Sequence, residues 1–272
     1  MVNGYQPASL QEALKIKAEN TATIYAGGTD LMVGKEKSDT FLFVNRIPEM
    51  RNITEDKEFL RIGAAVTFTE ILESPLAPQV LKAAVKLIAA PAIQNMGTMG
   101  GNIGNASAKA DSVLILYAAD ARLRLANIRG ERVIPVEEFY LGNKKLDLAE
   151  DEIIVEILLP KTGLENYYYH KVGAREALAI SRIAFAGIFA MDGERISNIS
   201  IAFGAVADTI LRFREIETML VGKTLEEAKT RKADFLAAYE KAIVPIQGRV
   251  SSEYRKDVCM NLLNDFLTQN NI

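Results

Sequence analysis

Hydrophobic positions change their spacing several times along this chain of 272 residues, and each spacing predicts a different element. Ser9 is placed to cap a helix that starts with the amphipathic set Leu10–Ile16. The short apolar runs Thr23–Ala26 and Phe41–Asn45 predict two strands. Between them, Gly27–Val33 predicts a glycine turn followed by a helix. The N-terminal segment is therefore expected to form a small α/β unit.

From Phe59 the pattern alternates, as in a half-buried strand, and Thr67 is placed to cap a following helix. The segment Asn95–Asn105 is dense in turn-forming residues and predicts a loop. The other elements expected here are a helix over Leu76–Ala89, an apolar segment at Val113–Ala119, and strands at Arg122–Ala126 and Ile153–Pro160.

Beyond about Leu164 the order of elements changes, which predicts a second domain over residues 164–272 after a first over 1–163. Long strands are expected at Tyr167–Val172, Ser181–Met191 and Ile196–Val206, the last two joined by a hairpin turn at Asp192–Glu194. Helices are expected at Phe213–Val221, Leu225–Ile243 and Glu253–Gln269. Three strands joined by short turns, then helices, indicate an antiparallel sheet with a helical layer.

The composition excludes several classes of partner and of metal site. The chain has 32 basic and 35 acidic residues, a formal charge of -3, which does not favour a nucleic-acid or anionic-membrane partner. No apolar run approaches the roughly 20 residues of a membrane span, and the N-terminus does not read as a secretory signal. One cysteine, Cys259, and one histidine, His170, leave no internal disulfide, multi-ligand zinc site or cysteine-bound iron–sulfur cluster. We therefore expect a cytoplasmic protein that relies on a cofactor for its chemistry.

The first candidate cofactor segment is Ala26–Leu31, which directly follows a predicted strand. Glycines lack a Cβ, so the backbone N–H groups of Gly27 and Gly28 can approach an anion closely. Thr29 adds a hydroxyl donor, and a helix starting just afterwards would add its positive end. This chemistry suits a pyrophosphate, and the alternative interpretation is an ordinary tight turn.

The second candidate segment is Thr98–Ser107, in which three glycines stand among Thr, Asn and Ser residues. These neutral donors could bind two phosphates and neighbouring hydroxyls. The segment is neither a P-loop nor a G-x-G-x-x-G dinucleotide motif. Its alternative interpretation is an irregular structural loop. Asp111, further along, could accept a hydrogen bond from a sugar or ribityl hydroxyl, or could be a solvated residue at a helix start.

At these residues the chain resembles the FAD-binding medium subunits of the molybdenum hydroxylases, which include those of xanthine, carbon monoxide and nicotinate dehydrogenases. The two segments, followed by Asn105-Ala-Ser and Asp111, look like that family's two FAD signatures. The similarity extends to Tyr5–Leu14, Lys171–Arg175, Leu220–Lys223 and Ser252–Arg255, and so covers nearly the whole chain. Gln94 and Ala108 stand where family members often have Arg and Pro.

The resemblance implies an α+β fold. It consists of a PCMH-type FAD-binding domain in two subdomains, about 1–55 and 56–163, and a C-terminal domain with a three-stranded antiparallel sheet and a helical bundle. It implies non-covalent FAD, with Leu31 near the isoalloxazine and Lys171 near the flavin's pyrimidine edge, and it implies no catalytic or metal-ligating residue. The implied FAD contacts are Ala26, Gly27, Gly28, Thr29, Asp30, Leu31, Thr98, Gly100, Gly101, Asn102, Asn105, Asp111 and Lys171.

The resemblance further implies an electron-transfer subunit of an oxidoreductase. Electrons would come from iron–sulfur clusters on a 2Fe-2S small subunit, beside a molybdopterin-binding large subunit, and pass from FAD to NAD⁺ or another acceptor. A dimer of heterotrimers is the implied assembly. Two alternatives stay open: a free-standing FAD-dependent oxidase or reductase, and a non-catalytic scaffold that has lost FAD. Covalent flavin attachment through His170 or Cys259 is disfavoured because both lie far in sequence from the two segments.

Overall fold

The computed structural model describes residues 3–34, 39–176 and 178–272, and the chain forms two compact units. The first unit comprises Met1–Ala77, Ile88–Ser107 and Asp120–Lys161. The second comprises Pro78–Leu87, Ala108–Ala119 and Thr162–Ile272. Two short segments of the N-terminal half thus pack with the C-terminal part of the chain.

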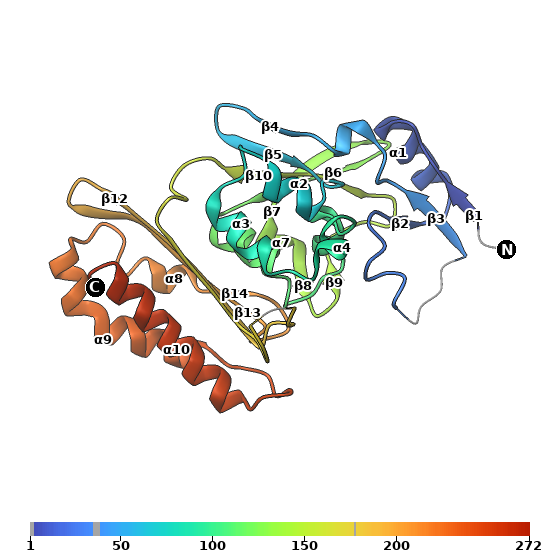
Figure 1. Ribbon diagram of the computed structural model, residues 1–272. Coiled ribbons are helices and arrows are strands. Elements are labelled where there is room, and N and C mark those ends of the chain that lie inside the picture. Colours follow the sequence, from blue (N-terminus) through green and yellow to red (C-terminus); the bar gives the residue numbers. More distant parts are fainter. Residues whose placement is uncertain (1–2, 35–38, 177) are drawn as a thin grey trace. The chain divides into compact units, whose positions relative to one another are not determined.

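The first unit begins with a small parallel sheet of order β1-β3-β2 (Figure 1). Its strands are β1 (Asn3–Tyr5), β2 (Thr23–Tyr25) and β3 (Thr40–Phe43). Helix α1 (Leu10–Glu19) connects β1 to β2, and the Ser9 hydroxyl caps it by accepting from the Glu12 N–H at 3.2 Å. The predicted cap, helix and strands are confirmed, and β2 ends where the first glycine segment begins.

A five-stranded antiparallel sheet of order β4-β5-β10-β6-β7 forms the rest of the first unit's framework. Its strands are β4 (Ile53–Glu55), β5 (Phe59–Gly63), β6 (Arg122–Asn127), β7 (Gly130–Pro135) and β10 (Ile153–Pro160). The unit also contains the 3-10 helix η1 (Pro48–Met50), helices α2 (Phe68–Glu73), α4 (Pro91–Gln94), α5 (Met99–Gly104) and α7 (Val136–Phe139), and the hairpin of β8 (Tyr140–Gly142) and β9 (Lys145–Leu146). Thr67 and Glu70 form a capping box at α2, as the sequence predicts for Thr67.

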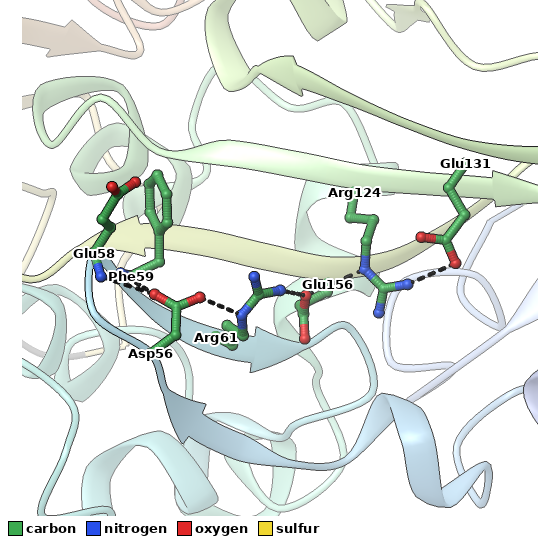
Figure 2. A network of polar contacts seen from close by, with 7 residues as sticks. All are labelled: Asp56, Glu58, Phe59, Arg61, Arg124, Glu131 and Glu156. Atoms are coloured by element: carbon green, nitrogen blue, oxygen red, sulfur yellow. Dashed lines mark hydrogen bonds and ion pairs between the residues drawn. The ribbon is translucent and has the colours of Figure 1, made fainter.

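A chain of charged side chains crosses this sheet (Figure 2). Arg61 on β5 bonds Asp56 at 2.7 Å and Glu156 on β10 at 2.8 Å. Arg124 on β6 bonds Glu156 at 3.2 Å and Glu131 on β7 at 2.9 Å. Single exposed pairs contribute little, but this network links four neighbouring strands and favours their observed register.

The second unit is built on a four-stranded antiparallel sheet of order β11-β12-β13-β14 (Figure 1). Its strands are β11 (Tyr167–Val172), β12 (Ile183–Asp192), β13 (Arg195–Gly204) and β14 (Leu211–Arg212). Its helices are α3 (Gln79–Lys86), α6 (Asp111–Ala118), α8 (Arg214–Glu217), α9 (Leu225–Ala242) and α10 (Ser252–Gln269). The three predicted strands and their hairpin are confirmed, and the two-residue β14 adds a fourth.

The core of the second unit lies between this sheet and α8, α9 and α10. Phe185, Phe203 and Phe266 are fully buried there in a single apolar cluster. Two of the predicted helices are shorter than expected. Pro78 occupies the N-cap of α3 and disfavours helical backbone at the residue before it, so α3 begins at Gln79 instead of Leu76, and α8 ends at Glu217. Among the described helices, none has the length and hydropathy of a membrane span.

Candidate functional site

The first unit contains a cavity of about 770 Å³. This volume falls within the range typical of sites for drug-sized molecules and cofactors. Both predicted segments contribute to its walls, together with residues of β10 and of the hairpin β8–β9. The predicted site residues that line it are Ala26, Gly27, Gly28, Thr29, Asp30, Leu31, Thr98, Gly100, Gly101, Asn102 and Asn105.

The two glycine segments approach each other at backbone distance. A Cβ placed on Gly27 would lie 1.9 Å from the carbonyl oxygen of Met96, just before the second segment. A Cβ on Gly101 would lie 3.8 Å from the Cβ of Ala26. Residues some seventy positions apart in sequence are therefore neighbours here, and only glycine fits at position 27 without moving the backbone.

The first segment forms a turn where the sequence predicts a helix, at least through Gly34, the last residue described before the next gap. Gly28 adopts a left-handed φ of 70°, and its carbonyl accepts from the Met32 N–H at 3.0 Å. The N–H groups of Val33 and Gly34 both donate to the Asp30 carbonyl, at 3.1 and 3.2 Å. The stretch between Gly28 and Gly34 is too short to overcome the cost of helix nucleation.

This turn leaves main-chain donors unused. Within the described part of the chain, the backbone N–H groups of Gly27, Gly28 and Thr29 donate to no protein acceptor. All three residues are half-buried and line the cavity. Backbone donors that are removed from water are almost always paired, so these groups require a ligand or water as partner. Successive N–H groups around a left-handed residue form the kind of concavity that binds anions.

The second segment is helical, although the sequence predicts a loop. The Thr98 hydroxyl caps α5 by accepting from the Gly101 N–H at 3.0 Å. The first two N–H groups of α5 donate to backbone carbonyls outside the helix. The Met99 N–H donates to the Val66 carbonyl at 2.9 Å and the Gly100 N–H to the Ala64 carbonyl at 2.8 Å. These tertiary contacts and the cap stabilise a short helix that glycine propensity alone disfavours.

Two charged residues on the cavity wall, Lys144 and Glu152, were not among the predicted site residues. Lys144 lies in the turn between β8 and β9. Glu152 receives two bonds from Arg132, at 2.7 and 2.8 Å, and Arg132 also bonds Asp147 at 2.6 Å. The Arg132 guanidinium lowers the pKa of Glu152 below its ordinary value. The turn-forming residues Gly142 and Asn143 predict a hairpin from the sequence. They do not indicate which cavity that hairpin lines.

Asp111 and Lys171, the remaining predicted site residues, lie in the second unit and do not line the cavity. They bond each other, with 2.7 Å between the Lys171 Nζ and the Asp111 Oδ2. The Ser181 hydroxyl donates to the Asp111 Oδ1 at 2.6 Å, and Lys171 also donates to the Leu87 carbonyl at 2.9 Å. Burial raises the pKa of Asp111, against the opposing effects of Lys171 and Ser181.

Burial of this pair excludes the interpretation of Asp111 as a solvated residue at a helix start. The side chains of Asp111 and Lys171 are only 5% and 8% exposed, so neither is a solvated surface residue. Sequence reasoning predicted each of them singly and missed both their pairing and Ser181. No spacing rule would have found it, because the contact joins the start of α6 to the end of β11.

Cys259 is a poor candidate for covalent attachment of a flavin. It is fully buried in the core of the second unit, on α10. Burial raises its pKa to about 12, so the thiol stays protonated near neutral pH. His170 is exposed on β11, where its ring stacks on that of Tyr168.

Comparison with known proteins agrees with this geometry. The family model of the FAD binding domain in molybdopterin dehydrogenase matches residues 1–162, and that of the CO dehydrogenase flavoprotein C-terminal domain matches residues 167–270. The xanthine dehydrogenase FAD-binding subunit of Escherichia coli O157:H7 is 31% identical over 95% of this chain and 91% of the relative. The carbon monoxide dehydrogenase medium chain of Hydrogenophaga pseudoflava is 30% identical over 85% of this chain and 84% of the relative.

The solved structures agree as well. The structure of carbon monoxide dehydrogenase from Hydrogenophaga pseudoflava that lacks the Mo-pyranopterin moiety has a chain that superimposes with a TM-score of 0.88. That chain is 27% identical, and the match covers 98% of this chain and 96% of the other. The predicted α+β fold class, with an FAD-binding domain followed by a C-terminal domain of antiparallel sheet and helices, is thereby confirmed. Given these matches along nearly its whole length, the chain belongs to the family of FAD-binding medium subunits of the molybdenum hydroxylases.

Proposed function

We propose that this chain binds one FAD non-covalently in the cavity of the first unit and relays electrons through it. The observation that carries the proposal is the meeting of two glycine segments, one of them with unused backbone donors, at a single cavity of cofactor size. Electrons would arrive from iron–sulfur clusters on a partner chain. They would leave to NAD⁺ or another acceptor.

The residues of the cavity fit a dinucleotide with a central diphosphate. The free N–H groups of Gly27, Gly28 and Thr29 suit the diphosphate oxygens, since a cluster of main-chain dipoles stabilises negative charge without a titrating group. The side-chain amides of Asn102 and Asn105 can bond ribityl hydroxyls and phosphate oxygens.

The remaining cavity roles follow the same chemistry. Leu31 would offer an apolar surface to the isoalloxazine, while Ala26, Asp30, Thr98, Gly100 and Gly101 would complete the wall. When bound, FAD supplies the redox chemistry of the subunit, and the protein supplies binding and orientation.

The pair Asp111–Lys171 is proposed as a second contribution to flavin binding. Asp111 would accept a bond from a sugar or ribityl hydroxyl, and Lys171 would offer positive charge to the flavin's pyrimidine edge. The pair supports these roles by being preorganised: Ser181 and the Leu87 carbonyl fix both side chains before any ligand is present. An ammonium held in this way would stabilise negative charge on a reduced flavin.

The proposed partners are a molybdopterin-binding large subunit and a 2Fe-2S small subunit, in a cytoplasmic assembly that is a dimer of heterotrimers. Support comes from the relatives, because the match spans 84% of a protein named as the medium chain of carbon monoxide dehydrogenase. A subunit that carries only flavin needs such partners to receive electrons from a substrate.

Purification of the full chain tests the proposal. We expect a yellow protein with an oxidised-flavin spectrum and about one FAD per chain after reconstitution. A folded protein that takes up no FAD would refute the assignment. Affinity purification from the native host, followed by identification of the co-purifying chains and their molybdenum and iron content, tests the partner assignment separately.

A further inference from the structure

We propose that Lys144 is an additional diphosphate-binding residue of the cavity, supplying a positive charge in the same cavity as the neutral backbone donors. The inference rests on the proposed function in that it takes a diphosphate as the ligand. It is carried by the position of Lys144, by its hydrogen bonds, and by the charges around it.

The position of Lys144 is fixed by an unusual backbone. It lies in the tight turn between Gly142 at the end of β8 and Lys145 at the start of β9, and it lines the cavity. Its φ is 57°, in the left-handed region that L-residues other than glycine, asparagine and aspartate seldom adopt. A lysine here departs from the local preference of the turn, and the turn fixes where its side chain leaves the backbone.

The ammonium group of Lys144 is oriented but not neutralised. Its Nζ donates to the backbone carbonyl of Asn105 and, at 2.9 Å, to the Oδ1 of the same residue. Both acceptors are uncharged, and no carboxylate in the described part of the chain forms an ion pair with Lys144. An ammonium has three donors, so one N–H stays free for a further acceptor.

The other charges of the cavity indicate that this free donor suits an anionic ligand. Its other charged side chains, within the described residues, are the acidic Asp30 and Glu152. Arg132 already compensates Glu152 through its two short bonds. A bound diphosphate would therefore meet two carboxylates and one ammonium among these residues, and Lys144 is the group that can offset its charge.

The contact with Asn105 also joins the hairpin to the second glycine segment. Asn105 directly follows α5, and its own N–H donates to the Gly101 carbonyl at 3.0 Å. Lys144 thus links two walls of one cavity through a single residue. An anion that took the third N–H would bind to a group whose orientation is already set, which reduces the entropy lost on binding.

Three variants of the full chain distinguish the effect of the Lys144 charge from a general effect on the structure. K144M removes the charge and keeps much of the side-chain length, K144R keeps the charge, and K145M removes the charge of the exposed neighbouring lysine as a matched control. The affinity of each for FAD, ADP and riboflavin is measured by calorimetry. Circular dichroism checks that each variant is folded.

We expect K144M to weaken FAD and ADP about tenfold and riboflavin less than twofold, because riboflavin has no phosphate. K144R should stay within about threefold of wild type, and K145M should match wild type. Unchanged FAD and ADP affinities in K144M, or equal losses for riboflavin, would overturn the proposal. If wild type binds ADP but not FAD, and K144M weakens ADP, then the flavin function fails while the Lys144 site stands. If wild type binds neither, both fail.

Discussion

The close approach of Gly27 to Met96, just before the second glycine segment, can be tested by adding one carbon atom. Gly27→Ala places a Cβ 1.9 Å from the Met96 carbonyl oxygen and 2.7 Å from its carbonyl carbon. Ordinary contacts of a Cβ begin near 3.4 Å. The obstructing atoms are backbone, so no rotamer change relieves the overlap, and one segment must move away from the other.

The expected magnitude follows from the overlap. Displacing well-packed backbone to admit one methyl group typically costs about 1–3 kcal/mol. In the free protein, the two segments can move apart and relieve this strain. A diphosphate bound between them would draw the segments together again and restore the strain. If that full amount opposes binding, FAD affinity falls by roughly fivefold to 150-fold, since each 1.4 kcal/mol is about tenfold.

The assay is calorimetric titration of the full-length variant with FAD, together with urea unfolding in the presence and absence of FAD. Gly204→Ala is the matched control. Its φ also lies outside the left-handed region, and its added Cβ would meet the Ala108 carbonyl oxygen at an ordinary 3.5 Å. We expect the control to bind FAD as wild type does. A folded Gly27→Ala protein with wild-type FAD affinity would show that the close approach of the two segments does not matter for FAD binding.

Two further predictions concern ion pairs. Lys171→Met should lower the free energy of unfolding by about 3–5 kcal/mol, since Asp111 would stay buried with Ser181 as a partner but no cation. The loss should shrink from about pH 7 to about pH 5, because a carboxylate with a raised pKa gains a proton in the folded state as the pH falls. Urea titrations at both pH values test this, and adding Asp111→Asn should restore much of the stability. Asp56 has its pKa lowered to about 2 by the N–H groups of Phe59 and Glu58 and by Arg61, so its contribution is present above about pH 3.8 and lost as the pH falls towards 2. Asp56→Asn should flatten the fall in melting temperature over that interval, and an unchanged slope would contradict the assignment.

Elements with a strong local signal were predictable from the sequence. Ser9 and Thr67 precede apolar helices and cap them as expected, and Gly193 makes the hairpin turn between β12 and β13. The strands Tyr167–Val172 and Ile153–Pro160 have the bounds that the pattern predicts. In each case the information lies in the residues themselves or in their immediate neighbours.

Elements that depend on tertiary contacts were missed. Helix α5 is rich in glycine and forms because Ala64 and Val66 accept its first N–H groups. Burial on α10 also depends on tertiary contacts, since the aromatic Tyr254 is 44% exposed whereas the charged Arg255 is buried. Arg255 donates to the carbonyls of Arg182 and Ala205, far away in sequence, which no helical periodicity reveals.

The candidate site shows the same division. The glycine segments were recognisable because backbone approach to an anion demands particular residue types. Lys144 and Ser181 were not, because each acts through a partner brought close by the fold. A lysine in a polar turn and a serine before a strand carry no local mark of that role.

Hydrogen exchange of the full chain, measured with and without FAD, shows whether the two glycine segments share one ligand. We expect FAD to slow exchange of the backbone N–H groups of Gly27, Gly28 and Thr29, and protection of Thr98–Asn105 to appear over the same range of FAD concentration. Protection confined to one segment, or FAD binding that protects neither, would contradict the claim that both glycine segments hold one diphosphate.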